Sequence, residues 1–483
     1  MPADPIIVWF RQDLRIADNP ALVAAVDAGA PVLPVYVLDD ATSSDWRMGG
    51  ASRWWLHHAL ASLADDLKGI NSTLILRQGN SSDVLDQLID ETGAQSVFWN
   101  RCYEPDAISR DKALKAGLLD RGIEARSFNA SLLFEPWTIE TKTGGPYRVF
   151  SPFWRACMGK TAGLEHAYAK PKNLQAPASW PASDTLSDWS LTPTSPDWAE
   201  GFSKMWQPGT KGALDRLSRF LDDTINDYPD ARDCPGVDGT SGLSPHLHFG
   251  DIGPRQVYWA ARDAADDGRA TDKAVKKFVA ELGWREFSYH LLYHFPAIPT
   301  DNFQDKFDDF PWRQDDDGLR AWQRGMTGYP MVDAGMRQLW QTGWMHNRVR
   351  MIVASFLVKH LMIHWHEGEK WFWDTLVDAD LANNAASWQW VAGSGADAAP
   401  YFRIFNPITQ GQKFDANGDY IRRYVPELSK LPDKYIHSPW TAPEEVLDEA
   451  GINLGTDYPD PVVDHSDART RALDGYQEIR KAG

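Results

Sequence analysis

Cysteine is scarce in this chain of 483 residues: Cys102, Cys157 and Cys234 lie far apart, without the spacing of a metal site. The sequence therefore offers no disulfide framework and no zinc site, and we expect reduced, mostly buried thiols. A hydrophobic run long enough to span a membrane is also lacking, and the chain reaches its first apolar run, at 6–10, without the pattern of a signal peptide. We expect a monomeric, cytoplasmic protein with no metal and no membrane partner.

Positive charge is in deficit, because the formal net charge is −18 at pH 7. This argues against a protein that coats nucleic acid without specificity, since phosphate contacts need lysine and arginine. The charges are segregated, however. An acid-free stretch at 334–366 carries Arg337, Arg348, Arg350 and Lys359. By contrast, 301–317 contains seven aspartates, so a local basic surface is compatible with the composition.

The first 130 residues alternate between short apolar runs and amphipathic segments. Strands are predicted at 6–10, 31–38, 73–76 and 96–99, and helices at 20–28, 52–68, 82–92 and 108–120. Such alternation is typical of an α/β domain with a doubly wound parallel sheet. No G-x-G-x-x-G motif follows the first strand, so we do not expect a dinucleotide in this half.

A connector rich in proline, serine, threonine and aspartate, most clearly at 170–207, precedes a second domain of different character. Helical spacing then recurs at 212–224, 254–266, 272–292, 329–342, 346–361, 369–376 and 382–390, without comparable strand patterns. We predict an α/β domain at 1–130, a linker at 131–206 and an all-α domain at 207–483. The polar C-terminal end is expected to be peripheral.

Two helical segments place polar and aromatic or sulfur-containing side chains on shared faces. A spacing of three joins Glu281 to Trp284, and a spacing of four joins Asn347 to Met351. A carboxylate beside an aromatic plane suits a flat ligand with hydrogen-bonding edges. Taken singly, each segment is also explained by a packed tryptophan or methionine with solvated polar neighbours, so both interpretations stay open at this point.

A third segment, at a predicted helix start, groups two acids, two amides and two indoles: Asp378, Asp380, Asn383, Asn384, Trp388 and Trp390. Carboxylates at such a position often cap helices, but this set is larger than capping requires. Upstream, hydroxyl and backbone N–H groups that could cradle a pyrophosphate occur in the run Gly239-Thr240-Ser241-Gly242-Leu243-Ser244-Pro245.

In this order and spacing the segments resemble the photolyase and cryptochrome family, from Ile6 to about Leu428. The opening signature of the family is similar to Val8-Trp9-Phe10-Arg11-Gln12-Asp13-Leu14-Arg15 and Asp18-Asn19-Pro20. The most specific match is Asp397-Ala398-Ala399-Pro400-Tyr401-Phe402-Arg403-Ile404-Phe405-Asn406-Pro407, followed by Gln410-Gly411 and Lys413-Phe414-Asp415. Within the family, the motifs are most similar to those of class I cyclobutane pyrimidine dimer photolyases.

The resemblance implies an α/β antenna domain followed by an all-α domain that binds FAD. By matching position, the flavin would be lined by Tyr228, Thr240, Ser241, Gly242, Leu243, Ser244, Phe278, Arg350, Asp378, Asp380 and Asn384. Arg350 would pair with Asp378 close to the ring, and Asn384 would face the flavin N5.

The resemblance also implies a partner, UV-damaged DNA in single- or double-stranded form, whose dimer is extruded into a cavity beside the flavin. Excited FADH⁻ would donate the electron that splits the dimer. Trp284 and Trp390 would form aromatic walls, Glu281 and Asn347 would hydrogen-bond the thymine edges, and Met351 would pack against the dimer. Positions that contact phosphates match Arg232, Arg348 and Gln410.

The chain contains 23 tryptophans, and the resemblance gives three of them a function. Trp388, Trp365 and Trp312 match the relay that carries electrons from the surface to oxidised flavin, although all three also suit a hydrophobic core. Relatives that repair (6-4) photoproducts carry histidines where this chain has Asn347 and Met351. The expected lesion is therefore a cyclobutane dimer.

A second, antenna chromophore is left open by the motifs. Folate-binding relatives place an Asn-Glu pair where this chain has Asp106 and Ala107, so a deazaflavin, folate, another flavin or an empty crevice near Glu104 all stay possible.

Two other functions compete with light-driven repair. One is a cryptochrome-type blue-light photoreceptor without repair activity, which the short C-terminal region disfavours. The other is a dark flavin oxidoreductase, for which the sequence shows no nicotinamide site.

Overall fold

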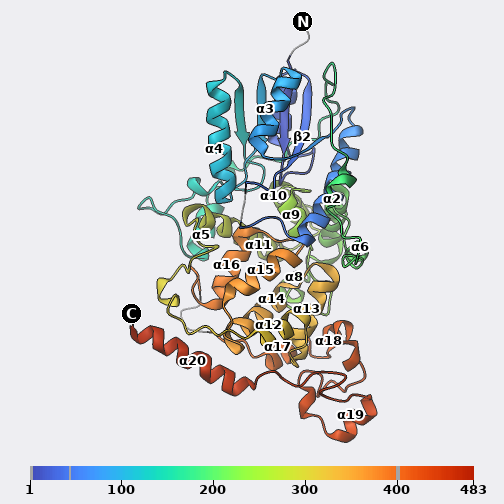
Figure 1. Cartoon of the computed structure of the whole chain (residues 1–483), viewed down its shortest axis with the longest axis vertical. Coiled ribbons are helices and arrows are strands. Elements are labelled where there is room, and N and C mark those ends of the chain that lie inside the picture. Colours follow the sequence, from blue (N-terminus) through green and yellow to red (C-terminus); the bar gives the residue numbers. More distant parts are fainter. Residues whose placement is uncertain (1–3, 43–44, 399–402, 483) are drawn as a thin grey trace.

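The N-terminal domain is built on a parallel β-sheet. The computed structural model describes residues 4–42, 45–398 and 403–482. The sheet has the strand order β3-β2-β1-β4-β5, and each neighbouring pair is parallel. The strands are β1 (Ile6–Phe10), β2 (Val32–Leu38), β3 (Ile75–Gln78), β4 (Ser96–Asn100) and β5 (Glu124–Phe128). Figure 1 shows this domain at the end of the molecule that carries the N-terminus, with the helical part beyond it.

Alternate side chains of β1 enter two separate hydrophobic cores. Ile6, Val8 and Phe10 pack with α1 (Pro20–Asp27) and α2 (Gly50–Lys68). On the other face, Ile7 and Trp9 pack with α3 (Ser81–Thr92) and α4 (Pro105–Asp120). Because successive side chains of a strand point to opposite faces, helices cover both sides of the sheet. The predicted doubly wound architecture is confirmed.

The sequence pattern does not indicate one strand, β5, which forms an edge of the sheet. Glu124 and Arg126 are exposed there, and Ala125 is the one buried residue of the strand. An edge strand with one side open to solvent buries little, so it lacks the continuous apolar run that marks β1 and β2.

The connector between the domains is irregular for most of its length, as predicted, but it packs closely. It contains two helices that its composition does not indicate, α5 (Phe150–Met158) and α6 (Phe202–Met205). Trp189, Leu191 and Trp206 are buried in the same core as α2. The connector is therefore a layer of the folded protein that covers the sheet domain.

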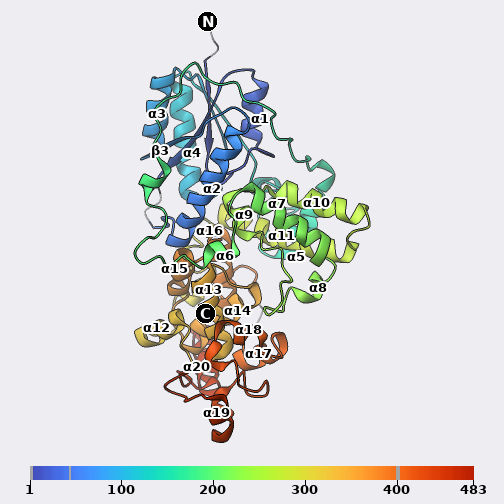
Figure 2. The same cartoon turned by 90° about the vertical axis from the view of Figure 1, so that its right-hand side faces the viewer.

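The C-terminal domain is helical, which confirms the predicted fold class. Its helices are α7 (Thr210–Arg219), α8 (Tyr228–Ala231), α9 (Ser244–Phe249), α10 (Pro254–Asp266), α11 (Asp272–His294), α12 (Asp316–Arg324), α13 (Pro330–Thr342), α14 (Asn347–Ser355), α15 (Trp365–Thr375), α16 (Leu381–Ala392), α17 (Pro407–Phe414), α18 (Asp419–Tyr424), α19 (Glu444–Ala450) and α20 (His465–Ala482). Figure 2 shows α10 and α11 beside the sheet domain and α17 to α20 at the far end. In the described ranges, no helix is long and apolar enough to cross a bilayer.

The C-terminal helix α20 lies at the edge of the molecule (Figure 1), as expected, and docks onto the domain through the buried Ala468, Ala472 and Ile479. One expectation about the surface is wrong. Lys359, counted above in a basic stretch, is also buried and donates a hydrogen bond to the carbonyl oxygen of Arg403. Charge counted along a sequence does not report burial, and here it overstates the basic surface.

A buried carboxylate fastens the connector to the long helix α11. Glu286 accepts a hydrogen bond from the backbone N–H of Phe134 at 3.0 Å, and its second carboxyl oxygen has no hydrogen-bond partner among the described residues. Burial raises the pKa of Glu286 to about 7. The adjacent Arg285 donates to the carbonyl oxygen of Ser131 at 2.6 Å. Two neighbouring side chains of α11 therefore hold the connector.

Glu286→Gln is expected to change how the stability of the protein depends on pH. Because the pKa of Glu286 rises from 4.5 to about 7 on folding, the native state favours the protonated acid, and the wild-type chain loses stability as the pH rises through this window. The glutamine variant does not titrate, so it should gain about 3 kcal/mol relative to wild type between pH 4.5 and pH 7.5. Urea unfolding at both pH values measures this gain, and a difference that is independent of pH would contradict the shifted pKa.

Candidate active site

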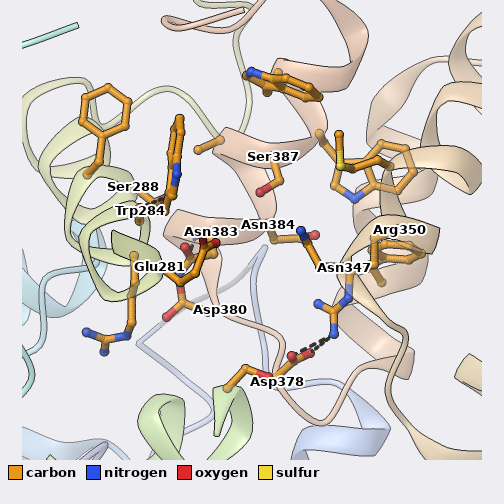
Figure 3. Close-up of a pocket in the computed structure, with 18 of the residues that line it drawn as sticks. Glu281, Trp284, Ser288, Asn347, Arg350, Asp378, Asp380, Asn383, Asn384 and Ser387 are labelled. Atoms are coloured by element: carbon orange, nitrogen blue, oxygen red, sulfur yellow. Dashed lines mark hydrogen bonds and ion pairs between the residues drawn. The ribbon is translucent and has the colours of Figure 1, made fainter. Parts of the chain in front are cut away.

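A cavity of about 520 Å³ opens between α11, α14 and α16. Most of the predicted site residues line it: Tyr228, Arg232, Ser241, Leu243, Ser244, Phe278, Glu281, Trp284, Asn347, Arg350, Met351, Asp378, Asp380, Asn384, Trp388 and Trp390. Of the predicted Thr240–Ser244 run, Thr240 and Gly242 stand outside the lining that the described residues form. Figure 3 shows the two sides of the cavity, with Glu281, Trp284 and Ser288 facing Asn347 and Arg350 across Asn383, Asn384 and Ser387.

Helix geometry explains why these residues converge. Glu281, Trp284 and Ser288 follow one another on α11 at spacings of three and four, so they project from one face. On α14, Asn347 and Met351 are four residues apart and line the opposite wall. The spacing visible in the sequence therefore places each pair correctly within its own helix, while the tertiary fold brings the two faces together.

The start of α14 depends on a neutral histidine. His346 caps the helix, with its Nδ1 accepting a hydrogen bond from the backbone N–H of Arg348 at 3.2 Å. Burial lowers the pKa of His346 to about 4, so the ring is neutral at pH 7 and can accept this bond. His346 therefore fixes the start of α14, whose first residue, Asn347, lines the cavity.

An ion pair lies at one end of the cavity. Arg350 Nη2 is 3.0 and 2.8 Å from the two carboxylate oxygens of Asp378, as the dashed lines of Figure 3 mark. Asp378 is 8% exposed, and the guanidinium of Arg350 balances its negative charge. Arg350 is itself fixed, because its Nε donates to the carbonyl oxygen of Met345 at 2.7 Å. The pair implied by the resemblance is present.

Asp378→Asn is expected to weaken flavin retention about tenfold, which corresponds to about 1.4 kcal/mol. The amide removes the charge that orients Arg350, and the arginine is left without its counterion at the cavity edge. The ratio of flavin to polypeptide after extensive dialysis measures the effect. Asp374→Asn is a matched control, because Asp374 is exposed and binds the backbone N–H of Gly50 outside the cavity. Equal flavin content in both variants would contradict the assignment.

Asp380 begins α16 and joins it to two other helices. One carboxylate oxygen accepts a hydrogen bond from the backbone N–H of Asn383 at 2.9 Å. The other lies 3.3 Å from His248 Nδ1 and accepts a hydrogen bond from the Tyr289 hydroxyl. Burial alone would raise the pKa of Asp380, but His248, Arg285 and Tyr289 hold it below its ordinary range. Asp380 is therefore a buried, ionised carboxylate in the cavity wall.

Asn384 is fixed from behind by α15. Its Nδ2 donates to the carbonyl oxygen of Glu369 at 3.0 Å. The Glu369 side chain is fully buried, and burial raises its pKa well above the ordinary value, so the acid is neutral. Within the described residues its carboxyl oxygens have no hydrogen-bond partner. On the α15 side, Asn384 therefore contacts polar groups without a charge.

Glu281, the expected lesion contact, forms an ion pair with Arg232 in the cavity wall. Lys277 Nζ lies 3.8 Å from the same carboxylate, and the Arg232 guanidinium is 5.4 Å from the centre of the Tyr228 ring. The structure therefore places Arg232, which was expected to contact phosphate, directly beside Glu281. The two residues are 49 positions apart, so no local sequence pattern indicates their contact.

The residues present fit a flavin dinucleotide. The cavity volume is within the range of small-molecule sites, and the lining combines aromatic faces, such as Phe278 and Trp388, with polar groups at Asp380 and Asn384. A flat ring with hydrogen-bonding edges needs this combination of apolar faces and polar rims. The ionised Asp380 and the Arg350 ion pair supply charge at separate points of the wall.

Of the three tryptophans predicted to form an electron relay, one lines the cavity, and the other two lie in or against the hydrophobic core, outside the cavity lining. Trp388 lines the cavity and is 2% exposed, while Trp365 is fully buried in the same core. Trp312 is partly exposed and packs against that core. The His364 ring lies between the last two, with its centre 5.6 Å from Trp365 and 4.9 Å from Trp312.

A second hollow, of about 520 Å³, contains two residues expected to contact DNA. Arg348 and Gln410 line it together with Arg403 and Lys413. Arg348 is paired with Asp233 at 2.9 Å. The motif at 397–407 reaches this hollow, but its central part, 399–402, lies outside the described residues.

A third cavity, of about 320 Å³, lies at the carboxyl ends of β1 and β2, where a doubly wound sheet commonly binds ligands. Glu104, Asp106 and Ala107, the positions discussed above for an antenna, all line it. Burial raises the pKa of Glu104, and Gln12 donates a hydrogen bond to it at 3.0 Å. His248 lines both this crevice and the main cavity, so a thin wall separates the two.

Several polar residues of the main cavity wall are not singled out by the sequence pattern, among them His248, Arg285 and Ser288. For Ser288 and His248, the spacing in the sequence does indicate a place in the cavity wall. Ser288 continues the face of Glu281 and Trp284 by one further turn, and His248 is four residues after Ser244. Arg285 projects from a different side of α11, and only the tertiary packing shows that it contacts the wall.

Comparison with known proteins agrees with this geometry. Residues 278–478 match the family model described as the FAD binding domain of DNA photolyase, and residues 6–177 match the DNA photolyase model. A deoxyribodipyrimidine photo-lyase from Agrobacterium fabrum is 55% identical over 99% of this chain and 98% of its own length. Cryptochrome-1 from Arabidopsis thaliana is 40% identical over 98% of this chain and 70% of its own length.

A solved structure corrects one expectation. A bacterial class III photolyase from Agrobacterium tumefaciens superimposes with a TM-score of 0.96 at 54% identity, covering 100% of this chain and 98% of the other. The prediction that the chain stands nearest to class I enzymes is therefore wrong. It rested on short motifs and cavity residues rather than on the sequence as a whole. The fold, the cavity and these similarities establish that the chain belongs to the photolyase and cryptochrome family and carries its FAD-binding domain.

Proposed function

We propose that the protein repairs cyclobutane pyrimidine dimers in DNA under blue light. The arrangement of the main cavity supports this proposal most directly, because Glu281 and Trp284 face Asn347 across a space beside the Arg350 ion pair. Met351 lines the same cavity. When bound, the reduced FAD would supply the excited electron that splits the dimer. The photo-lyase at 55% identity supports the same conclusion.

The chain's own residues would bind and orient the lesion. Trp284 and Trp390 would stack against the extruded pyrimidines, since aromatic side chains stack on bases of any sequence. Glu281 and Asn347 would hydrogen-bond the base edges. Asn347 and Met351 offer no titratable proton, which supports a cyclobutane dimer over a (6-4) photoproduct as the substrate. Phosphates on either side of the lesion would reach Arg348 and Gln410.

The test compares light and dark reactions on defined DNA. Protein reduced with dithionite is incubated with an oligonucleotide that contains one thymine dimer, and recovery of the monomeric thymines is measured in darkness and under blue light. We expect recovery in the light reaction alone. An oligonucleotide with a (6-4) photoproduct is the matched control. Repair of the control, or no recovery from the dimer, would refute the proposed substrate.

A cryptochrome-type photoreceptor is the second candidate, and the 40% identity with a plant cryptochrome favours it. This function predicts flavin that is reduced by light but no repair of the dimer. The oligonucleotide experiment therefore separates the two candidates through dimer loss, and a parallel sample with oxidised flavin reports reduction of the flavin by light.

We further propose that the crevice at the sheet edge holds a second chromophore. Its volume and polar lining, with the half-buried Glu104, support a site for a flat, hydrogen-bonding molecule such as a deazaflavin, a folate or a flavin. The absorption spectrum of the purified protein tests this, because a second chromophore adds a band beside that of FAD.

We also propose that the protein works as a monomer in the cytoplasm.

A further inference from the structure

Three aromatic rings form a parallel stack at the cavity wall. The rings of Phe150 and Trp284 are 3.7 Å apart at their centres, with an interplanar angle of 9°. Phe150 is also parallel to Trp154, at 6.4 Å and 11°. Trp284 belongs to α11 and lines the cavity, whereas Phe150 and Trp154 belong to α5, in the connector. The wall of the cavity is therefore backed by a segment from outside the helical domain.

The surroundings of the stack fix its position. The buried Phe287 packs edge-on against both Phe150 and Trp284, with ring centres 6.1 Å from each. Gly283 allows Trp154 to approach α11, because a Cβ atom at this glycine would be 2.6 Å from Trp154 Cδ2.

The first residue of α5 is tied to a second residue of the cavity lining. The backbone N–H of Phe150 donates to the Asp397 carboxylate at 3.0 Å, and Asp397 itself lines the cavity. Asp397 follows α16, the helix that carries Trp390. Phe150 therefore connects the segments that present the two aromatic walls.

One face of Trp284 is covered by Phe150, and the side chain as a whole is 38% exposed. We propose that Phe150 is a positioning residue, which holds the Trp284 indole as a preformed stacking surface for an extruded pyrimidine dimer and so strengthens binding of damaged DNA. This inference rests on the proposed function. An indole without this support would have to be ordered when the lesion binds, and ordering one side chain weakens binding by about 2- to 12-fold.

The test measures DNA affinity in darkness, so it does not depend on the photochemistry. Phe150→Leu keeps an apolar side chain but removes the plane, whereas Phe150→Tyr keeps the plane. Each protein is titrated into a fluorescent oligonucleotide with one thymine dimer and into the undamaged sequence. We expect Phe150→Leu to raise the Kd for the dimer about 3- to 10-fold, with the Kd for undamaged DNA unchanged and with wild-type values for Phe150→Tyr.

A double-mutant cycle with Trp284→Ala shows whether Phe150 acts through the indole. Adding Phe150→Leu to Trp284→Ala should cause no further loss of dimer affinity. Equal affinity of Phe150→Leu and wild type for the dimer, loss in Phe150→Tyr as well, or a further loss in the double variant would each overturn the inference. Flavin absorbance checks that the variants are folded, and Phe150→Met replaces Phe150→Leu if that variant loses flavin. A wild-type protein without preference for the dimer would instead refute the proposed function, and the inference with it.

Discussion

Trp388→Phe is expected to abolish reduction of the bound, oxidised flavin by light while leaving dimer repair by chemically reduced protein largely intact. Of the three tryptophans predicted to form the relay, Trp388 is the one that lines the cavity, so we expect it to deliver the electron to the flavin. Phenylalanine fills much of the same space but is far harder to oxidise. An added barrier of about 3 kcal/mol already slows a step about a hundredfold. Bleaching of the flavin absorption under blue light, with a thiol as the electron source, measures the rate.

Trp322→Phe is the matched control for this variant. Trp322 is also fully buried, and its ring centre is 6.2 Å from that of Trp388, but it points into the core, where its Nε1 donates to the carbonyl oxygen of Val353 at 2.9 Å. We expect the control to keep flavin reduction within about twofold of wild type, because it disturbs packing and not the relay. Equal loss of flavin reduction in both variants, or loss of repair in Trp388→Phe, would show that Trp388 has another role.

Residues that lie close together in the sequence were predictable as local groups. The Glu281 and Trp284 face and the Asn347 and Met351 face follow from helical spacing alone, and the structure places both in one cavity. The strands of the sheet domain were predictable for a similar reason, because buried parallel strands are continuous apolar runs. The edge strand β5 was not, since it buries little.

Contacts between distant segments could not be predicted in this way. The pairing of Arg232 with Glu281 and the stack of Phe150 on Trp284 join residues from different helices. A signal for α5 was nevertheless present, because Phe150, Phe153, Trp154 and Cys157 recur at helical spacing. The polar composition of the surrounding connector concealed it. The missed helix α5 bears on the proposed function, because it supports the cavity wall.

Glu281→Ala is expected to lower dimer repair per absorbed photon about tenfold or more, with flavin content within about twofold of wild type. In the proposed function Glu281 contacts the lesion, and the variant leaves intact the polar groups proposed to hold the flavin, Arg350, Asp378 and Asp380. Repair yield of chemically reduced protein, at saturating DNA, isolates the reaction from binding. Loss of flavin from this variant would contradict the assignment of Glu281 to the lesion.

Because Glu281 pairs with Arg232, a second substitution can test whether Glu281 acts on the dimer or only balances the arginine charge. Removing Glu281 leaves the Arg232 charge without its partner, and a lone charge in a partly buried wall could itself disturb the site. The double variant Glu281→Ala/Arg232→Ala separates the two explanations. If Glu281 serves only to balance Arg232, the second substitution should restore the repair yield. If Glu281 acts on the dimer itself, as we expect, the yield should stay as low as in Glu281→Ala.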